Sequence, residues 1–250
     1  SGLEEVVQLD SAMGHWYGTH RSVRIIHDQR TNLLRRVLDR HFTDLPEPEF
    51  HLLPNADLPG FSVACLLRQP ANLMPRVAIG LGSGARLVPA MYRSLLEAAA
   101  VQWLALWVTV EEHAKQPGGS AGLPAPTPRG TADIYDLESN VGMYASVEGS
   151  ALVERRYGDC DQAAASDLAP DDPREPRQVI RDLVNAFRST GKQLCWADLS
   201  TVDIIALGFT VTRVWSPDTL SLSLPGAPPR RHRRFAQYGG FRHDAPHPFP

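Results

Sequence analysis

The chain is poor in cysteine, and the few that it has exclude two kinds of protein. It holds three in 250 residues, Cys65, Cys160 and Cys195. An odd number at distant positions argues against a disulfide framework, and there is no CxxC pair or HExxH motif with the spacing of a zinc site. Because free thiols fit a reducing compartment, we expect a cytoplasmic protein.

The chain also lacks a large excess of charge of one sign and long uninterrupted apolar runs. A formal net charge of -3 at pH 7 gives no reason to expect nucleic acid as a partner. Glu97 and Gln102 interrupt the longest apolar stretch, and no signal peptide is visible, so we expect no membrane segment. The chain opens on Ser1-Gly2 and enters a helical pattern at once. We therefore expect that an N-terminal portion is missing or that the gene product is short.

What the chain does have is the composition of a globular protein, with 43% hydrophobic and 21% charged residues. Strand and helix patterns alternate without the regular spacing of a doubly wound sheet, which predicts an α+β fold with mixed sheets packed against helices. We expect one domain over 1–250, with flexible excursions near 115–130 and 159–177. The predicted helices span 3–16, 31–40, 89–110, 178–189 and 202–207, the strands span 60–67, 77–81, 193–197 and 209–215, and a short strand plus a helix lies within 134–156.

The C-terminal end alternates proline with other residues, Pro246-His247-Pro248-Phe249-Pro250. Each proline fixes its own φ, removes a backbone donor and pushes the preceding residue towards an extended conformation. The end is therefore predicted to be a stiff, polyproline-like rod that holds its carboxylate at a defined place. A frayed, proline-rich terminus is the alternative that these residues alone leave open.

Arg213 lies in an apolar pattern. With a period of two it shares a strand face with Phe209, Val211 and Trp215, and a buried guanidinium needs an anion. The planar fork of arginine suits a phosphate. A partner carboxylate, or an edge strand whose arginine reaches solvent, is the other interpretation.

Glu97 lies on a helix that is apolar nearly all round, so we expect this helix to be buried. Its carboxylate needs either an ion pair with Arg93, one turn earlier, or a role as a metal or nucleotide ligand, since Mg²⁺ prefers one or two carboxylates plus phosphate oxygens. The preceding run Gly80-Leu81-Gly82-Ser83-Gly84 could cradle phosphate, but it matches no complete phosphate-binding motif, and the pattern favours a tight strand-to-helix turn at 82–84. The basic run 230–234 is interpreted as a solvated face, with docking of an acidic peptide or steering of ATP as the alternative.

Five segments of this chain occur in the same order in a known family. They are the helix Leu3-Glu4-Glu5-Val6-Val7-Gln8-Leu9-Asp10, the pair Gly80-Leu81-Gly82 with Arg93-Ser94-Leu95-Leu96-Glu97-Ala98-Ala99, the segment Ala197-Asp198-Leu199-Ser200-Thr201, the strand around Arg213 and the proline-alternating end. In this order they resemble the C-terminal part of YcaO-domain proteins, in particular the azoline-forming cyclodehydratases of ribosomal peptide biosynthesis. The resemblance covers the whole chain but only the C-terminal majority of a family domain.

The resemblance implies a reaction. A Cys, Ser or Thr side chain of a precursor peptide attacks the preceding backbone carbonyl, ATP phosphorylates the resulting oxygen, and loss of phosphate leaves an azoline ring. It implies ATP and Mg²⁺ as cofactors, with Glu5 and Glu97 as metal ligands. The nucleotide contacts that it implies are Glu5, Gln8, Glu97 and Arg213. The catalytic tail that it implies consists of Pro246, Pro248 and Pro250, with the Pro250 carboxylate positioning or deprotonating the peptide.

The resemblance also implies partners. Family members usually work with a precursor peptide and a leader-peptide-binding protein, and often with a flavin-dependent dehydrogenase that oxidises azoline to azole. A homodimer is compatible with the sequence. Thioamide or amidine formation, which relatives perform, is less expected with a tail of this form.

The chain departs from the family pattern at several positions. The second carboxylate of the first pair is replaced by Gln8, the second ligand of the long helix falls on Ala100, and an expected Asp-His pair reads Asn140-Val141. These departures favour a second hypothesis, a degenerate subunit that binds a peptide or a partner enzyme without chemistry. A third is an unrelated interaction module whose exposed proline tail is a ligand for aromatic grooves.

Overall fold

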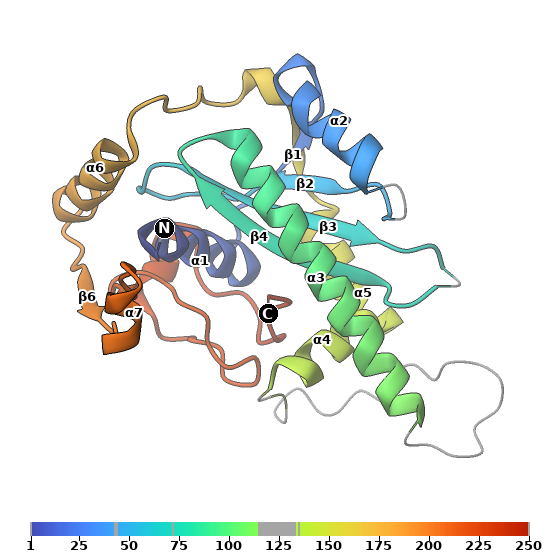
Figure 1. Ribbon diagram of the computed structural model, residues 1–250. Coiled ribbons are helices and arrows are strands. Elements are labelled where there is room, and N and C mark those ends of the chain that lie inside the picture. Colours follow the sequence, from blue (N-terminus) through green and yellow to red (C-terminus); the bar gives the residue numbers. More distant parts are fainter. Residues whose placement is uncertain (1, 43–44, 72, 115–133, 135, 250) are drawn as a thin grey trace.

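The computed structural model describes residues 2–42, 45–71, 73–114, 134 and 136–249 (Figure 1). Its main sheet has five strands in the order β4-β3-β2-β1-β5, and a second sheet pairs β6 with β7. The β1–β5 pair is parallel and the other pairs are antiparallel, so the main sheet is mixed, as predicted. The strands are β1 (Val23–Ile26), β2 (Glu49–Leu52), β3 (Phe61–Arg68), β4 (Val77–Gly84), β5 (Asp161–Ala164), β6 (Cys195–Asp198) and β7 (Thr212–Trp215).

Helices cover both faces of the main sheet, as an α+β fold requires. None of the helices in the described ranges has the length and apolar character needed to cross a membrane. The helices are α1 (Gly2–Tyr17), α2 (Asn32–His41), α3 (Leu87–Ala114), α4 (Leu137–Ala145), α5 (Val147–Tyr157), α6 (Pro176–Ser189) and α7 (Val202–Ala206), with 3-10 turns η1 (Gln29–Thr31), η3 (Ala165–Asp167) and η4 (Arg233–Tyr238).

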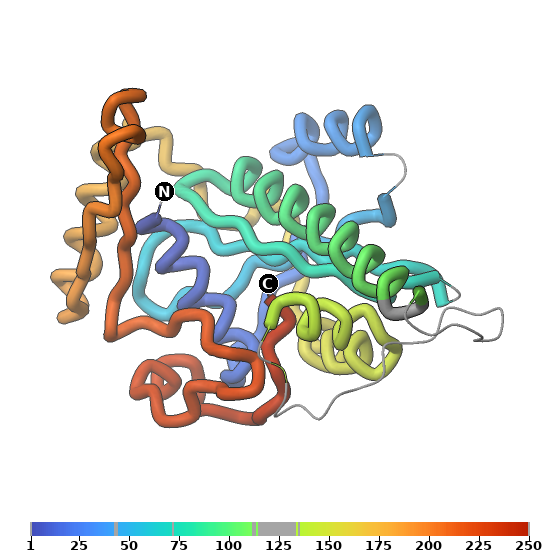
Figure 2. The backbone as a smooth tube through the Cα atoms, turned by 60° about the horizontal axis from the view of Figure 1, so that its bottom comes forward, coloured from blue at the N-terminus to red at the C-terminus, as the bar shows by residue number. Residues whose placement is uncertain are grey.

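The two long strands separate two apolar cores. On β3, Val63 and Cys65 belong to the core beneath α3, whereas Ala64 and Leu66 belong to the core that contains α1 and the C-terminal segment. This alternation follows from the period of two along a strand, and both sets are apolar because both faces are covered. Figure 2 shows the same layers from another side, with α3 and α1 on opposite faces of these strands.

Several predicted elements are wrong in extent or type. β1 and β2 are four-residue strands that the sequence did not predict, and β5 lies in the stretch 159–177 that was expected to be a flexible excursion. Residues 137–157 form two helices, because Ser146 ends α4 and its side chain accepts a hydrogen bond from Gly149 N to cap α5. The expected excursion near 115–130 falls outside the described residues.

The apolar sequence of α3 predicts a helix that is buried all round, and this prediction is wrong. Its inner face carries Leu95, Ala98 and Val101, which are buried against the sheet. Its outer face carries Trp103 and Trp107, whose exposed fractions are 69% and 66%. The apolar outer face is therefore a surface and not a second core.

A buried ion pair fastens α1 to the η4 turn. The Arg234 guanidinium donates from Nε to both carboxylate oxygens of Asp10 at 3.0 Å, and Tyr238 Oη donates to Oδ2 at 2.9 Å. Leu220 N donates to Oδ1 at 2.8 Å. Arg234 was interpreted as part of a solvated basic face, and this is wrong for Arg234, because its side chain lies almost wholly inside the protein.

Replacing Asp10 with alanine should lower the free energy of unfolding by about 3–5 kcal/mol, because the buried Arg234 guanidinium loses its main carboxylate and keeps, among the described residues, only Asp57, 2.8 Å from Nη1, as an anionic partner. Urea unfolding followed by circular dichroism measures the change. Asp244→Ala is the matched control, since Asp244 pairs with Arg230 on the surface and such pairs contribute about 1 kcal/mol or less. Equal losses in the two variants would contradict this assignment.

Candidate functional site

The candidate site lies along the free edge of β4, the outermost strand of the main sheet. Two side chains of α3, one turn apart, bind backbone groups of this edge. Glu97 Oε1 accepts a hydrogen bond from Leu81 N at 3.1 Å, and Arg93 Nη1 donates to Ser83 O at 2.5 Å. Arg93 therefore binds the strand, and no ion pair between Arg93 and Glu97 forms.

Two glycines bring α3 close enough to β4 for these bonds. A Cβ at Gly80 would lie 2.1 Å from Ala98 N, and one at Gly82 would lie 2.2 Å from Ala90 O. Both residues lie inside β4, so the prediction that the run 82–84 forms a strand-to-helix turn is wrong. The glycines allow a close approach of helix and strand, and they do not form a phosphate loop.

Glu5 of α1 lies near enough to Glu97 for its negative charge to act on the Glu97 carboxylate. Burial raises the pKa of Glu97, the hydrogen bond from Leu81 N lowers it, and the negative charge of Glu5 raises it further. Within the described residues neither carboxylate forms an ion pair with a basic side chain. Two carboxylates that repel each other beside a partly buried edge fit a divalent cation whose remaining ligands are phosphate oxygens.

The raised pKa of Glu97 predicts a pH dependence of stability. The folded state holds the proton of Glu97 more tightly than the unfolded state, so folding is favoured at low pH and this contribution is lost as pH rises from about 4.5 through the raised pKa. Glu97→Gln should remove this slope, whereas Glu148→Gln on the exposed first turn of α5 should keep it. Urea unfolding between pH 4 and 7 measures both, and the same slope in all three proteins would count against the assignment.

The remaining positions of the expected ligand set add no carboxylate. Gln8 is half-buried on α1, one turn after Glu5, and Ala100 is exposed on the outer side of α3. Among the described residues, no three His, Cys, Asp or Glu side chains gather as a metal site would require. The pair Glu5 and Glu97 thus fits magnesium that arrives with a nucleotide better than a protein-held ion.

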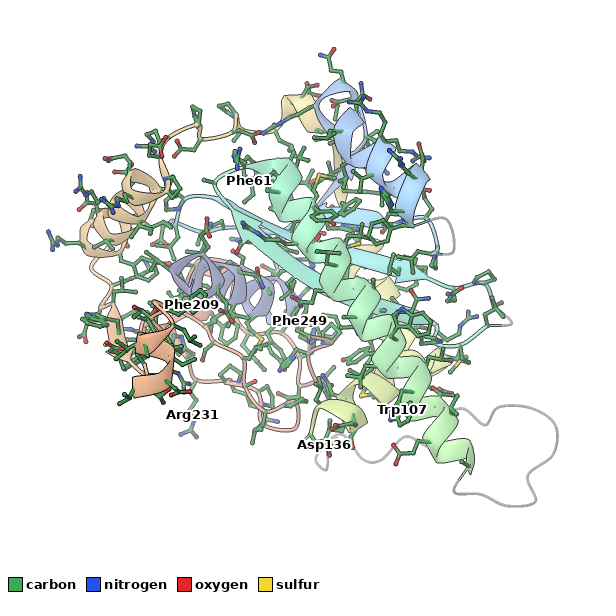
Figure 3. All side chains as sticks on the ribbon, viewed as in Figure 1. Phe61, Trp107, Asp136, Phe209, Arg231 and Phe249 are labelled. Carbon is green, nitrogen blue, oxygen red and sulfur yellow. The ribbon has the colours of Figure 1, made fainter. Side chains whose placement is uncertain are left out.

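Arg213 lies on β7 beside the start of α1, and it is exposed. A Cβ at Gly2 would lie 3.5 Å from Val214 Cγ2, so β7 packs against the helical turn that precedes Glu5. Of the two interpretations, the structure agrees with an arginine that reaches solvent from an edge strand, since β7 pairs only with β6 in its sheet. Phe209 and Val211 precede the strand and are exposed, so the apolar row does not form a buried face. Figure 3 shows Phe209 on this outer part of the molecule.

The C-terminal segment is threaded into the fold instead of lying on its surface. Residues 246–249 are buried and have no helix or strand structure, as the alternating prolines predict. Asn140 Nδ2 donates to the carbonyl oxygens of His247 and Phe249 at 3.1 and 3.2 Å, and Trp16 Nε1 donates to Ala245 O at 3.2 Å. Tyr144 Oη donates to Pro246 O. A frayed end and an exposed proline ligand are both contradicted.

Aromatic packing fixes the side chains of the same segment. The Phe249 ring lies edge-on to Trp16 with centroids 6.4 Å apart, and it stacks on His247 at 5.9 Å. Burial lowers the pKa of His247, whose Nε2 lies 2.8 Å from Ser223 O. Figure 3 shows Phe249 in the interior between α1 and α3. Pro246 and Pro248 are thus held in place, whereas Pro250 lies outside the described residues.

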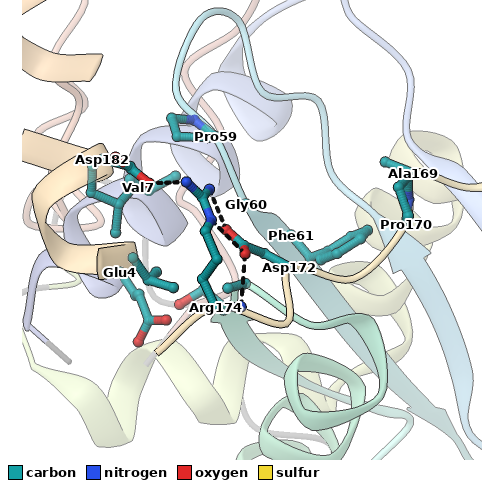
Figure 4. A pocket seen from close by; sticks show the side chains of 15 residues that line it. Glu4, Val7, Pro59, Gly60, Phe61, Ala169, Pro170, Asp172, Arg174 and Asp182 are labelled. Carbon is teal, nitrogen blue, oxygen red and sulfur yellow. Dashed lines mark hydrogen bonds and ion pairs between the residues drawn. The ribbon is translucent and has the colours of Figure 1, made fainter. Parts of the chain in front are cut away.

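A pocket of about 200 Å³ adjoins the first turn of α1 (Figure 4). Among the described residues that line this pocket, the one arginine is Arg174. It binds Asp172 at 2.5 Å and also Asp182. Two carboxylates therefore neutralise this guanidinium. The pocket wall also includes Glu4, so it does not favour a triphosphate.

A sequence profile of one family matches residues 1–220, and its description reads YcaO cyclodehydratase, ATP- and Mg²⁺-binding. The chain belongs to the YcaO family. None of the curated proteins compared with this YcaO chain matches it.

Solved structures share its fold. YcaO from Methanopyrus kandleri, bound with AMPPCP and Mg²⁺, is 20% identical with a TM-score of 0.56 over 91% of this chain and 56% of that one. A heterocyclase in complex with substrate and cofactor is 16% identical, with a TM-score of 0.64 over 99% and 31%. The E. coli microcin synthetase McbBCD complex is 13% identical, with a TM-score of 0.52 over 99% and 59%. The chain therefore spans about half the length of the Methanopyrus relative, and at these identities the likeness shows the fold alone.

No sequence pattern pointed to the residues that hold the tail of this YcaO chain. Asn140 was noted only as a departure from the family pattern, yet its amide donates to two tail carbonyls, which an ionised aspartate cannot do. Trp16 and Tyr144 gave no signal beyond their aromatic character. Contacts across more than one hundred residues leave no local pattern in a sequence.

Proposed function

We propose that this YcaO chain contributes the nucleotide site of an ATP-dependent cyclodehydratase that acts on Cys, Ser or Thr residues of a ribosomally made precursor peptide. The observation that carries the proposal is the pair Glu5 and Glu97, two neighbouring carboxylates without a basic partner in the described structure, of which Glu97 binds the edge of β4. The buried, proline-alternating end supports the peptide part of the proposal.

The proposed reaction is a balanced dehydration. The side-chain thiol or hydroxyl adds to the preceding backbone carbonyl, and the former carbonyl oxygen takes the γ-phosphoryl group of ATP. The C–O bond to that oxygen then breaks, phosphate leaves, and the nitrogen loses its proton as the C=N bond forms. One peptide and one ATP give one azoline, ADP and phosphate.

Each candidate residue has a role that its chemistry allows. Glu5 and Glu97 would hold magnesium, which when bound neutralises charge on the phosphates, with Gln8 as a neutral contact one turn from Glu5. Arg213, on the strand beside α1, would meet phosphate through its guanidinium fork. Pro246 and Pro248 would orient the Pro250 carboxylate towards the peptide, where it positions the substrate or takes its proton.

The partners belong to the same proposal. A precursor peptide and a leader-peptide-binding protein would act together with this chain, and a flavin-dependent dehydrogenase would oxidise the ring. McbBCD, which shares the fold, is itself a complex of several proteins.

Incubation with ATP, magnesium, a partner protein and a peptide that contains Cys, Ser or Thr tests the reaction. Mass spectrometry should show loss of one water from the peptide for each phosphate released. Phosphate release without a change in peptide mass would contradict ring formation.

A non-catalytic peptide-binding or partner-binding subunit is the second candidate. It is favoured by Gln8 and Ala100, since neither side chain brings the charge that the family ligand set would supply. In that case the chain would bind peptide without magnesium-dependent nucleotide affinity.

A further inference from the structure

A pocket of about 310 Å³ lies at the end of α1 that is remote from Glu5. Its apolar wall consists of Trp16, Leu152 and Ala245, which come from α1, from α5 and from the segment that leads into the buried tail. Trp16 follows Glu5 by eleven positions, or about 16 Å along the helix axis at 1.5 Å per residue. The pocket is therefore separate from the candidate nucleotide site.

Three guanidinium groups line this pocket, those of Arg155 and Arg156 on α5 and that of Arg242 before the tail. The one carboxylate among its described lining residues, Asp159, is already paired with Arg21 at 2.9 Å. Within the described part of the chain, Arg155 and Arg242 form no ion pair and no side-chain hydrogen bond, and both are exposed. The pocket thus carries more positive charge than its own residues neutralise.

Arg156 is half-buried, and part of its guanidinium group serves the fold. Nε donates to His15 O at 2.6 Å and Nη2 donates to His20 O at 2.6 Å, so these two nitrogens bind carbonyl groups at and just beyond the carboxyl end of α1. Among the described residues, none accepts a hydrogen bond from Nη1. Every acceptor that Arg156 uses is neutral, so this third arginine has no ion pair with the described residues either.

The positive charges in this pocket repel one another. Burial and the nearby charge of Arg242 lower the pKa of Arg156 to about 10, although Asp159 acts in the opposite direction. Burial and the charges of Arg156 and Arg242 also lower the pKa of His243. Ala245 N donates to His243 Nδ1 at 3.3 Å, which requires that nitrogen to be unprotonated. An anion bound beside the guanidinium groups would relieve this repulsion.

The lining favours an organic anion over an inorganic ion. A planar guanidinium group can bind a carboxylate through two parallel hydrogen bonds, and the arginines here adjoin an apolar wall. Ligand sites typically combine apolar walls with a few polar groups. Trp16 and Leu152 offer apolar surface to the stem of an acidic side chain, and inorganic phosphate has no such stem.

We propose that this pocket binds an acidic side chain of a peptide, with its carboxylate held by Arg155 and Arg242 and its stem on Trp16. The choice of a peptide rests on the proposed function, because Trp16 also packs edge-on against Phe249 of the tail, whose end would hold the substrate peptide. The carboxylate follows from the lining and does not depend on that function. An acidic residue a few positions from the modified Cys, Ser or Thr would then fix where along the peptide a ring forms.

Binding of a synthetic peptide, measured without ATP or magnesium, tests this proposal. The probe is a peptide of alternating Glu and Leu that carries a neutral dye, and fluorescence anisotropy follows its binding to the 250-residue chain. The wild type should bind it saturably, and more weakly at high salt. The same peptide with Gln in place of Glu should bind at least about tenfold more weakly. Inorganic phosphate should displace the peptide only at concentrations far above the Kd of the peptide.

Variants of the exposed arginines assign the binding to this pocket. Arg155→Gln and Arg242→Gln should each raise the Kd at least about tenfold, because each removes one charged partner of the carboxylate. Arg231→Gln is the matched control, since Arg231 is also exposed and has no ion pair in the described structure, but lies in the basic run 230–234. It should bind the peptide as the wild type does, and circular dichroism checks that all three variants are folded.

Any of four results would overturn the proposal. The first is no saturable binding up to about 1 mM peptide, and the second is equal binding of the Gln peptide. The third is displacement by phosphate at a concentration near the Kd of the peptide. The fourth is a loss of binding in Arg231→Gln that Arg155→Gln and Arg242→Gln do not share. Because no nucleotide enters the measurement, failure of the peptide to bind and failure of Mg–ATP to bind are separate results.

Discussion

Replacing Glu97 with glutamine should weaken magnesium-dependent ATP binding at least about 100-fold, or about 2.7 kcal/mol. The amide keeps the size of the side chain, and its oxygen still accepts the hydrogen bond from Leu81 N. It loses the negative charge that a magnesium ion needs, and it ends the repulsion from Glu5. The protein should therefore remain folded while the nucleotide site is lost, as titration calorimetry with and without magnesium would show.

A variant with increased Mg–ATP affinity would test the same metal site. Gln8→Glu adds a carboxylate one turn from Glu5, so Mg–ATP affinity should rise in the wild-type background. Glu148→Gln removes a charge of the same kind far along the sequence, on α5, and should bind as the wild type does. Unchanged affinity in Glu97→Gln, or equal losses in Glu97→Gln and Glu148→Gln, would show that the pair Glu5 and Glu97 is not the metal site.

Adding a single glycine after Pro250 should reduce cyclodehydration at least about 100-fold without destabilising the protein. The addition moves the terminal carboxylate by one residue, about 3.3–3.6 Å along an extended chain, and leaves every buried contact of 246–249 in place. A misplacement of even 1 Å can cost about a hundredfold in rate when a group must be held in position. Ring formation is followed by the loss of water from the peptide, and stability by thermal unfolding.

Removing a buried contact of the tail should have a different signature. Phe249→Ala leaves a cavity beside Trp16 and should cost about 3–5 kcal/mol of stability. If the glycine extension retains full activity, the terminal carboxylate takes no part in the reaction. If the extension unfolds the protein as Phe249→Ala does, the loss of activity says nothing about the carboxylate, and an amide at Pro250 without the added glycine replaces it as the test variant.

Several helices and β3, one of the two eight-residue strands, were the parts of the fold that the sequence predicted well. α1 and α6 have apolar residues at helical spacing, and β3 alternates between two covered faces, so local periodicity carries the information. The four-residue strands β1, β2 and β5 were missed although β6 and β7, which are equally short, were predicted, because β1, β2 and β5 are defined by pairing across the sheet and not by a local pattern.

The candidate site was predictable only in part. Glu97 stood out because a carboxylate interrupts an apolar helix, and the structure gives the reason, since its side chain binds the free edge of β4. The burial of Arg234 went against the prediction, and the exposure of Arg213 decided between the two interpretations that the sequence left open. Each depends on which distant segment lies opposite, Asp10 in the first case and open surface in the second, and a local pattern contains no such information.

The glycines of β4 show that a Gly-x-Gly pattern is compatible with two different local structures. A Gly-x-Gly pair before a helix is typical of a turn, yet here it lets a helix lie directly on a strand. The contact with Ala90 and Ala98 that decides between them comes from residues eight or more positions later. Family resemblance gave the right order of segments but could not give these distances.

The most direct test of the account is calorimetric titration of Mg–ATP into the folded 250-residue chain. The account predicts one nucleotide per chain, heat that disappears when magnesium is removed, and loss of binding in Glu97→Gln and in Arg213→Ala. Absence of binding by a chain that circular dichroism shows to be folded would contradict the nucleotide site at the edge of β4. It would leave this YcaO chain as a subunit that binds peptide or partner without ATP.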